Sequence, residues 1–445
     1  MRMEWKRTIL AIAMGVCAVT MAAQDKKTDN GSWPPPDQKA IKNWRSLRFG
    51  LFIHWGPVSL TGYEISWSRG WQTPIDVYDN LYKRFNPTKF NADEWVKIAK
   101  DTGMKYMVIT TKHHDGFCLW PSAETDYDIA ATPFKRDVVG ELVRACRKGG
   151  IRFGAYYSTC DWRHPAFPFG SPGGGSHKPH PDMAAYDHYL RAQTAELVKN
   201  YGPLLTLWFD IPQSYTEKYG LPTVRYLRKL QPDILINNRI YTPSKNNKDF
   251  AHQNELGDFN TPEQKIGNFN RERPWETCMT ICQQWSWKPD DKLKSLEQCV
   301  RTLLYTIGGD GNLLLNVGPM PDGRIEPRQV ERLKEMGQWV KKYSEAIYDT
   351  RGGPFKPGKW GASVCKGRDI YLFVMDWQNG DTITLPPIDA KILETKVLSG
   401  GTATVTQDKN GIKITLPQKD HAKIATVIKM RVDRDAFSIK PVDVK

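Results

Sequence analysis

The sequence predicts a (β/α)8-like barrel, which need not be regular, followed by a C-terminal antiparallel β-sandwich. Three observations predict this α/β fold. Short apolar runs alternate with longer amphipathic segments from about residue 45, polar residues close several of the runs, and the pattern changes after residue 350. A chain of 445 residues is long enough for a large catalytic domain and a smaller second domain.

Seven runs rich in β-branched and aromatic residues are expected to be strands. They cover residues 48–56, 105–117, 151–162, 204–210, 233–239, 273–281 and 312–319. The segments between them have helical spacing, and several end in Gly, as helices often do. This alternation indicates a parallel sheet. A barrel is favoured over a doubly wound sheet, because no Gly-rich phosphate-binding turn follows an early run. The sequence does not identify the eighth strand.

The N-terminus is typical of a secretory signal peptide over residues 1–23, with basic residues, an apolar run at 9–19 and small residues after it. We therefore expect an exported protein, periplasmic or secreted, that does not insert into a membrane. A polar, Pro-rich and extended linker is expected at 24–44, and the barrel-like catalytic domain at 45–350. The β-sandwich is expected at 351–445, where alternating runs are joined by Gly and Asn turns.

The composition indicates which classes of ligand the protein is expected to bind. The net charge is +14, but Lys and Arg are scattered along the chain and no nucleic-acid-binding motif is present, so a solvated basic surface is expected. The 16 Trp exceed the needs of an ordinary core and suit a site that stacks flat sugar rings. The sequence does not indicate the oligomeric state.

Two carboxylates are candidates for catalysis. Asp210 ends the apolar run "LLTLWFD", where a charge is costly unless it is used, although a helix N-cap is the alternative interpretation. Glu276 follows Trp275 in "PWETC", and an aromatic neighbour raises the pKa of a carboxylic acid, as suits a general acid. The alternative for Glu276 is an ion pair with Arg239 or Arg273. Together the two predict a glycosidase pair, with Asp210 as the nucleophile and Glu276 as the acid/base.

His54, His113 and His114 form a second group of candidates. His54 follows the first run. The adjacent His113 and His114 can face one ligand only where their strand breaks, as the following Asp-Gly indicates. These imidazoles are expected to hydrogen-bond the hydroxyl groups of a sugar. Three His also fit a metal site, but neighbouring His rarely chelate one ion, so no metal or organic cofactor is expected.

Aromatic residues near the ends of the runs are expected to form an apolar wall for a deoxy sugar, in which a methyl group replaces a hydroxymethyl group. The candidates are Trp55, Trp67, Tyr157 and Trp208. Arg239, in "INNR", is expected to hold the nucleophile ionised, because an adjacent cation lowers the pKa of a carboxylate.

Motifs from about residue 45 to about 350 resemble the α-L-fucosidase family, glycoside hydrolase family 29. They are "RFGLFIHWG", "TKHHDGFCLWPS", "LWFD", "INNR", "WETCMTI" and "GNLLLNVGPMPDG". The resemblance implies an exo-acting, retaining hydrolysis of terminal α-L-fucosyl residues from a fucosylated oligosaccharide or glycoconjugate, through a covalent glycosyl-enzyme. By the same resemblance, Asp210 matches the nucleophile, Glu276 matches the acid/base of members with a Trp-Glu-x-Cys motif, and the His residues, Tyr157, Trp208 and Arg239 line the fucose pocket.

Two departures from the family pattern leave alternatives open. Ile211 and Pro212 follow the nucleophile where many members have Gly. Ser66 precedes Trp67 where many have Glu, and the nearby Glu64 is the remaining candidate for that role. These departures motivate a fucose-binding protein without catalysis as the alternative. The same hydrolysis of a related sugar, such as an L-galactoside, is a further alternative, because a pocket rarely rejects one added hydroxyl strongly.

Overall fold

The computed structural model of the chain describes residues 33–171, 177–242, 256–378 and 380–444. The predicted signal peptide and the first part of the predicted linker lie outside these residues. Among the helices that the structure describes, none combines the length and the apolar character needed to cross a bilayer. The described residues from Pro35 onward belong to one compact unit, so the predicted domain boundary near residue 350 stays a prediction.

Seven parallel strands form one sheet, each within one of the seven runs predicted from the sequence. Their bounds are β1 Phe49–Ile53, β2 Tyr106–Lys112, β3 Arg152–Ser158, β4 Thr206–Asp210, β5 Leu235–Ile236, β6 Glu276–Thr280 and β7 Asn312–Val317. The strand order is β5-β4-β3-β2-β1-β7-β6. Most of these strands are buried along their whole length, as expected for a parallel sheet covered by helices on its outer side.

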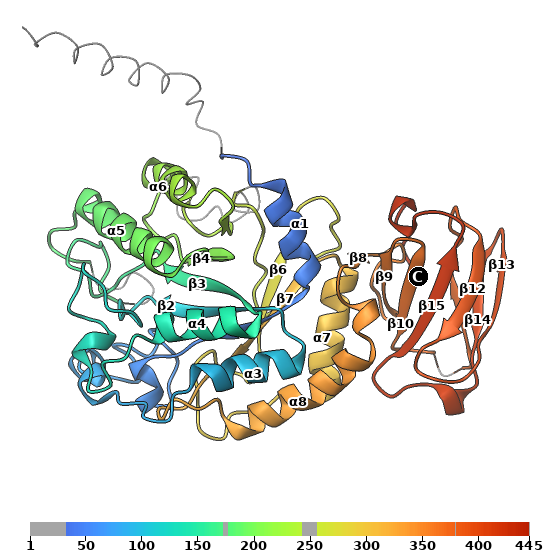
Figure 1. Ribbon diagram of the computed structural model, residues 1–445, viewed down its shortest axis with the longest axis horizontal. Coiled ribbons are helices and arrows are strands. Elements are labelled where there is room, and N and C mark those ends of the chain that lie inside the picture. The colour runs from blue at the N-terminus through green and yellow to red at the C-terminus, as the bar shows by residue number, and fades with distance from the viewer. Residues whose placement is uncertain (1–32, 172–176, 243–255, 379, 445) are drawn as a thin grey trace, which may run out of the picture. The chain divides into compact units, whose positions relative to one another are not determined.

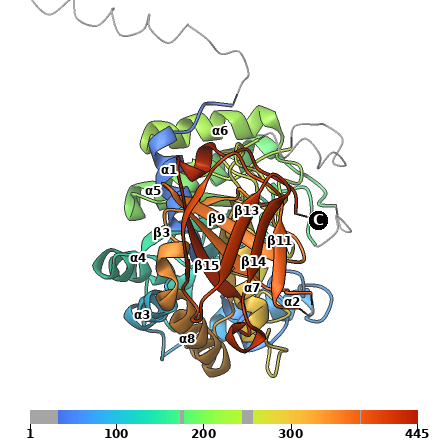
Figure 2. The same ribbon diagram turned by 90° about the vertical axis from the view of Figure 1, so that its right-hand side faces the viewer.

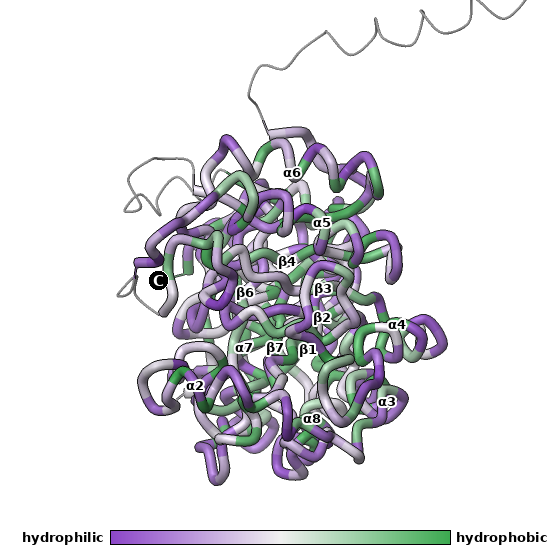
Figure 3. Tube along the Cα trace, turned by 90° about the vertical axis from the view of Figure 1, so that its left-hand side faces the viewer, coloured by the Kyte–Doolittle hydropathy of each residue, from purple (hydrophilic) through white to green (hydrophobic). Residues whose placement is uncertain are grey.

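Eight α-helices are present in the described part of the chain. Their bounds are α1 Gln38–Leu47, α2 Ile75–Tyr78, α3 Ala92–Thr102, α4 Val138–Gly149, α5 Met183–Tyr201, α6 Glu217–Leu230, α7 Leu296–Gly308 and α8 Pro327–Lys342. Figure 1 shows α3, α4 and α5 beside strands β2 to β4. In Figure 3, the strands lie at the centre and α3 to α6 lie around them. The parallel strands and outer helices confirm the barrel-like half of the predicted fold.

The helix ends follow from residues that the sequence supplies. Asn91 caps α3 by accepting a hydrogen bond from the backbone of Glu94, and Asp137 caps α4 in the same way. Both helices end at a glycine in the left-handed region, Gly103 with φ 91° and Gly150 with φ 72°. A side chain would be strained there, so these glycines end the helices and turn the chain back toward the sheet.

An irregular segment, residues 256–263, takes the place of the eighth strand between β5 and β6. On one side, the Asn238 amide donates to the Phe259 carbonyl (3.1 Å). On the other side, the Glu276 amide donates to the Asn260 carbonyl (2.8 Å), and Glu263 bridges to Cys278 in parallel. Because both neighbours are bonded in parallel, the carboxyl end of this segment lies at the same edge of the barrel as the ends of the regular strands.

The predicted linker is wrong over its last residues, because α1 begins at Gln38. Asp37 caps this helix by accepting from the Lys39 and Ala40 amides. Two apolar side chains one turn apart, Ile41 and Trp44, are buried against the barrel cluster, and the Trp44 ring lies 4.5 Å from that of Phe259. The apolar residues of this stretch recur at helical spacing, which is the pattern of a helix rather than of a polar linker.

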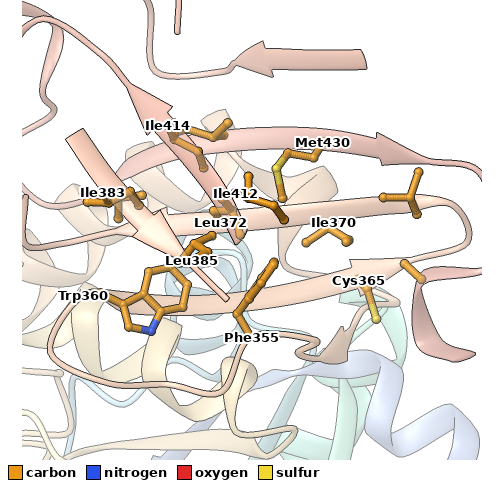
Figure 4. Packing of buried hydrophobic residues seen from close by; sticks show 14 of the residues in the cluster. Phe355, Trp360, Cys365, Ile370, Leu372, Ile383, Leu385, Ile412, Ile414 and Met430 are labelled. Atoms are coloured by element: carbon orange, nitrogen blue, oxygen red, sulfur yellow. The ribbon is translucent and has the colours of Figure 1, made fainter. Parts of the chain in front are cut away.

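The C-terminal region contains two antiparallel sheets, as predicted (Figure 2). Their strands are β8 Arg351–Gly352, β9 Gly361–Lys366, β10 Asp369–Val374, β11 Thr382–Leu385, β12 Ile392–Val397, β13 Thr404–Asp408, β14 Gly411–Thr415 and β15 Thr426–Val432. One sheet has the order β12-β15-β10-β9-β8 and the other β11-β14-β13. Figure 4 shows apolar side chains of both sheets, including Leu372, Ile412 and Ile414, packed together between them. This packing is that of a β-sandwich.

Candidate active site

A pocket opens at the carboxyl edge of the barrel, beside Asp210, which is the last residue of β4. Seven of the ten residues that the sequence predicted for the site line this pocket. The full lining is Phe52, His54, Trp67, His113, His114, Tyr156, Trp208, Asp210, Ile211, Arg239, Glu263, Cys278 and Trp285. The pocket therefore draws on the ends of β1 to β6 and on the irregular segment.

Asp210 is held by donors on both of its carboxylate oxygens. Arg239 Nη1 donates to Oδ1 at 2.9 Å, and the Tyr156 hydroxyl donates to Oδ2 at 2.8 Å. His114 Nε2 lies 3.9 Å from Oδ2. Burial alone would raise the pKa of Asp210, but the charge of Arg239, together with His114 and the hydrogen bonds, lowers it below its usual value. Asp210 is therefore ionised at neutral pH, as a nucleophile must be.

Arg239 joins Asp210 to a second carboxylate, Glu263. The same Nη1 atom lies 2.9 Å from Asp210 Oδ1 and 2.8 Å from Glu263 Oε2. These two oxygens are therefore less than about 6 Å apart, which is below the roughly 6.5–9.5 Å of inverting glycosidases and compatible with the roughly 5–5.5 Å of retaining ones. The Asp210 side chain is 13% exposed and that of Glu263 is 42% exposed. Glu263 thus stands at the open side of the pocket, where a leaving group departs.

The three histidines are neutral side chains at neutral pH. Burial lowers the pKa of His54 to about 3, that of His114 to about 4, and that of His113 well below its usual value. His54 Nδ1 lies 2.7 Å from Asn316 Oδ1, while Asn316 Nδ2 donates to the Trp285 carbonyl. His54 Nδ1 therefore carries the proton, which leaves Nε2 as an acceptor for a hydroxyl group.

Aromatic rings form one wall of the pocket. The rings of Tyr156 and Trp208 stack with centroids 5.5 Å apart, and the Arg239 guanidinium lies 5.1 Å from the Trp208 ring centroid. Phe52 packs against both of these rings. Such a surface excludes water and offers an apolar face to a methyl group.

Two predicted aromatic residues, Tyr157 and Trp55, point away from the pocket. Successive side chains of a strand alternate between its two faces. In β3, Tyr156 faces the pocket, and the buried Tyr157 donates from its hydroxyl to Gln193 of α5 (2.8 Å). At the end of β1, His54 faces the pocket, and Trp55 packs outside the barrel against Trp95. The prediction that Tyr157 and Trp55 contact the sugar is therefore wrong, and Tyr156 was missed by one position.

The prediction that Glu276 lies at the carboxyl end of a strand is also wrong. Glu276 is the first residue of β6, at the amino end, and it does not line the pocket. Its carboxyl group is fully buried beneath the pocket, where it accepts hydrogen bonds from Trp208 Nε1 (3.1 Å) and the Tyr106 hydroxyl. Burial raises the pKa of Glu276 to about 7, as predicted from its aromatic surroundings, but without access to a substrate. Glu276 supports the Trp208 indole rather than facing the sugar.

The structure shows how the chain accommodates its two departures from the family pattern, at Ile211 and at Glu64. Ile211 adopts φ 44°, a left-handed conformation that glycine adopts freely and a β-branched residue rarely does. In this conformation the Ile211 amide donates to Asp210 Oδ1 at 2.9 Å. The carboxylate of Glu64 accepts from the amides of Trp285 and Ser286, at 2.9 and 3.0 Å, so it fixes a pocket-lining segment without lining the pocket itself.

His113, His114 and Asp210 also form a group whose ligand atoms lie within 4.8 Å of one another, as a metal ion would require. However, Arg239 and Tyr156 already bond both oxygens of Asp210. A cation placed there would face the guanidinium at close range, which is unfavourable. The donors around Asp210 fit an ionised nucleophile better than a metal ligand.

Two carboxylates that share one guanidinium, one enclosed and one at the open side, provide what a retaining glycoside hydrolase needs. The barrel fold and the position of this pair at its carboxyl edge define the same class of enzyme.

Comparison with known proteins agrees with this class. The family profile described as alpha-L-fucosidase matches residues 16–345. Human plasma alpha-L-fucosidase is 29% identical over 420 residues, which cover 87% of this chain and 88% of the relative. An alpha-L-fucosidase structure from Paenibacillus thiaminolyticus has a TM-score of 0.79 at 31% identity, covering 89% of this chain and 99% of that one. A family 29 enzyme from Bacteroides thetaiotaomicron has a TM-score of 0.81 at 28% identity, covering 92% and 97%. The chain therefore belongs to the α-L-fucosidase family.

Replacing Glu276 by Gln should change how stability depends on pH. The raised pKa of Glu276 means that the folded protein binds this proton more tightly than the unfolded chain, so its contribution is fully present below pH 4.5 and is lost as the pH rises to about 7. The Gln variant cannot ionise. Between pH 4.5 and 8, the free energy of unfolding of the wild type should therefore fall by up to about 3 kcal/mol relative to that of Glu276→Gln. Urea unfolding at several pH values measures this, and a difference that does not change with pH would contradict it.

Proposed function

We propose that Asp210 and Glu263 are the nucleophile and the acid/base of an exo-acting, retaining α-L-fucosidase that removes terminal α-L-fucosyl residues from oligosaccharides or glycoconjugates. The observation that carries this assignment is the contact of Arg239 with both carboxylates. Family membership supports the retaining α-L-fucosidase activity. So does a similar structure, 27% identical with a TM-score of 0.80, which is the trapped covalent intermediate of the Bacteroides thetaiotaomicron enzyme with 2-fluoro-fucosyl fluoride.

The reaction has two steps. In the first, an Asp210 oxygen attacks the anomeric carbon, the glycosidic bond breaks, and Glu263 gives its proton to the leaving oxygen. In the second, Glu263 takes a proton from a water molecule, the water oxygen attacks the same carbon, and the ester bond to Asp210 breaks. Because the carbon is inverted twice, the released fucose keeps the α configuration.

The rest of the pocket supports a neutral, partly apolar ligand. The three uncharged imidazoles exchange hydrogen bonds with hydroxyl groups, with His54 Nε2 as an acceptor. The wall of Phe52, Tyr156 and Trp208 suits the methyl group of a 6-deoxy sugar. This wall favours fucose over a sugar with a hydroxymethyl group in that place, because the added hydroxyl would lose its hydrogen bonds.

We also propose that the protein is exported, to the periplasm or the medium. The support is the N-terminal sequence pattern of basic, apolar and small residues over residues 1–23.

The activity itself is tested by proton NMR of the protein acting on 4-nitrophenyl α-L-fucoside. The α-anomer of fucose should appear first and the β-anomer later, through mutarotation, because both steps occur at Asp210. Release of the β-anomer first would indicate a single displacement, and no release of fucose would contradict the proposed activity.

Azide separates the roles of the two carboxylates. In Asp210→Gly, azide can enter the space of the missing carboxylate, so an activated aryl fucoside should yield β-L-fucosyl azide. In Glu263→Ala, azide should attack the fucosyl-enzyme from the acceptor side and yield α-L-fucosyl azide. Without azide, loss of the Glu263 carboxyl should lower turnover by roughly 100-fold or more.

Glu276→Gln is the matched control for this experiment, because it alters a buried carboxyl near the pocket that does not line it. It should give no fucosyl azide in either configuration. Formation of α-L-fucosyl azide by Glu276→Gln but not by Glu263→Ala would reverse the assignment of the acid/base.

A further inference from the structure

Exposed apolar side chains are concentrated in one loop. Seven large hydrophobic residues are exposed among those that the structure describes, and five of them lie between Tyr63 and Val77, in the segment after β1. Three of the five are aromatic, namely Tyr63 (45% exposed), Trp67 (40%) and Trp71 (74%). Exposed aromatic residues clustered in this way are more typical of a binding surface than of an ordinary protein surface.

Hydrogen bonds to the pocket walls hold this loop in place. Glu64 accepts from the amides of Trp285 and Ser286, and Ser66 Oγ lies 2.6 Å from His113 Nδ1. Arg69 binds Asp79 through two hydrogen bonds, at 2.6 and 2.7 Å. The exposed rings are therefore carried on a fixed support, which lowers the entropy cost of binding a ligand.

The loop borders the pocket through Trp67. Trp67 lines the pocket and packs edge-to-face against His114, with centroids 5.6 Å apart, yet it also faces solvent. The Trp71 amide donates to the carbonyl of Ser68, the residue after Trp67, so a single turn separates the two Trp residues along the chain. The Tyr63 carbonyl accepts from the Ser286 hydroxyl, beside the pocket-lining Trp285.

We infer that Tyr63 and Trp71 form a rim platform that binds the sugar residues to which the cleaved fucosyl unit is attached. This inference rests on the proposed function. Once the terminal sugar is enclosed beside Asp210, the rest of the glycan has to leave the pocket at its open side, where Glu263 and Trp67 are exposed. Pyranose rings have apolar C–H faces that stack on Trp and Tyr, whose polar atoms can still reach water. The rim platform gives the enzyme a preference for oligosaccharides over simple fucosides.

Tyr63→Ala and Trp71→Ala test this inference with two kinds of substrate. α-L-Fucosyl fluoride has no acceptor sugar, and 2′-fucosyllactose, 3-fucosyllactose and 6-O-fucosyl-N-acetylglucosamine present three acceptors. Each variant should keep the wild-type kcat/KM for the fluoride. Each should lose roughly three- to tenfold in kcat/KM for the oligosaccharide that the wild type cleaves best, mainly through KM. Leu393→Ala, which removes an exposed apolar side chain from β12, is the control and should change neither value.

Each contrary outcome has its own meaning. An equal loss on both substrates would mean that the loop supports the pocket, and no loss on either would mean that the rings do not bind the acceptor.

Sedimentation of the double variant, Tyr63→Ala with Trp71→Ala, shows whether the rings instead join two copies of the chain. Cleavage of the fluoride but of none of the three glycans by the wild type would also overturn the rim platform. Failure to hydrolyse even the fluoride would contradict the proposed function itself.

Discussion

The contact of one guanidinium with two carboxylates sets both the spacing and the charge of the site. Burial and a nearby second carboxylate both disfavour the ionised form of Asp210. Arg239 offsets both effects and keeps Asp210 ionised despite its burial. Arg239 is itself held by the carbonyl and hydroxyl of Thr261, in the irregular segment that closes the barrel. The closure of the barrel and the geometry of the two carboxylates therefore depend on the same residues.

The sequence predicts the parts of the site that lie at the ends of regular strands. A charged or imidazole side chain after a buried apolar run is conspicuous, and it identifies His54, His113, His114 and Asp210. The break after β2 explains how both adjacent histidines reach one pocket, because the alternation of side chains ends with the strand. The seven strands were predictable for the same reason, since their apolar runs are long and bounded by polar residues.

The remaining parts depend on features that an apolar run does not specify. Tyr156 and Tyr157 are adjacent, and only the phase of the strand decides which one faces the pocket. Glu276 lies at the amino end of the barrel because β6 begins there. Glu263 lies at the carboxyl end, in an eighth segment whose sequence has no strand-like pattern. An aromatic neighbour correctly indicated the raised pKa of Glu276, but a raised pKa also arises in a buried carboxyl that never meets the substrate.

The most direct test of the central claim is to identify the residue that forms a covalent bond to the sugar. The protein is inactivated with 2-deoxy-2-fluoro-α-L-fucosyl fluoride, digested with pepsin, and the labelled peptide is sequenced by mass spectrometry. We expect one label per chain, on Asp210 in the peptide that contains "LWFD", and none in the Asp210→Asn variant. A label on Glu263 or on any other residue, or inactivation without covalent attachment, would contradict the account of Asp210 as a nucleophile held ionised by Arg239.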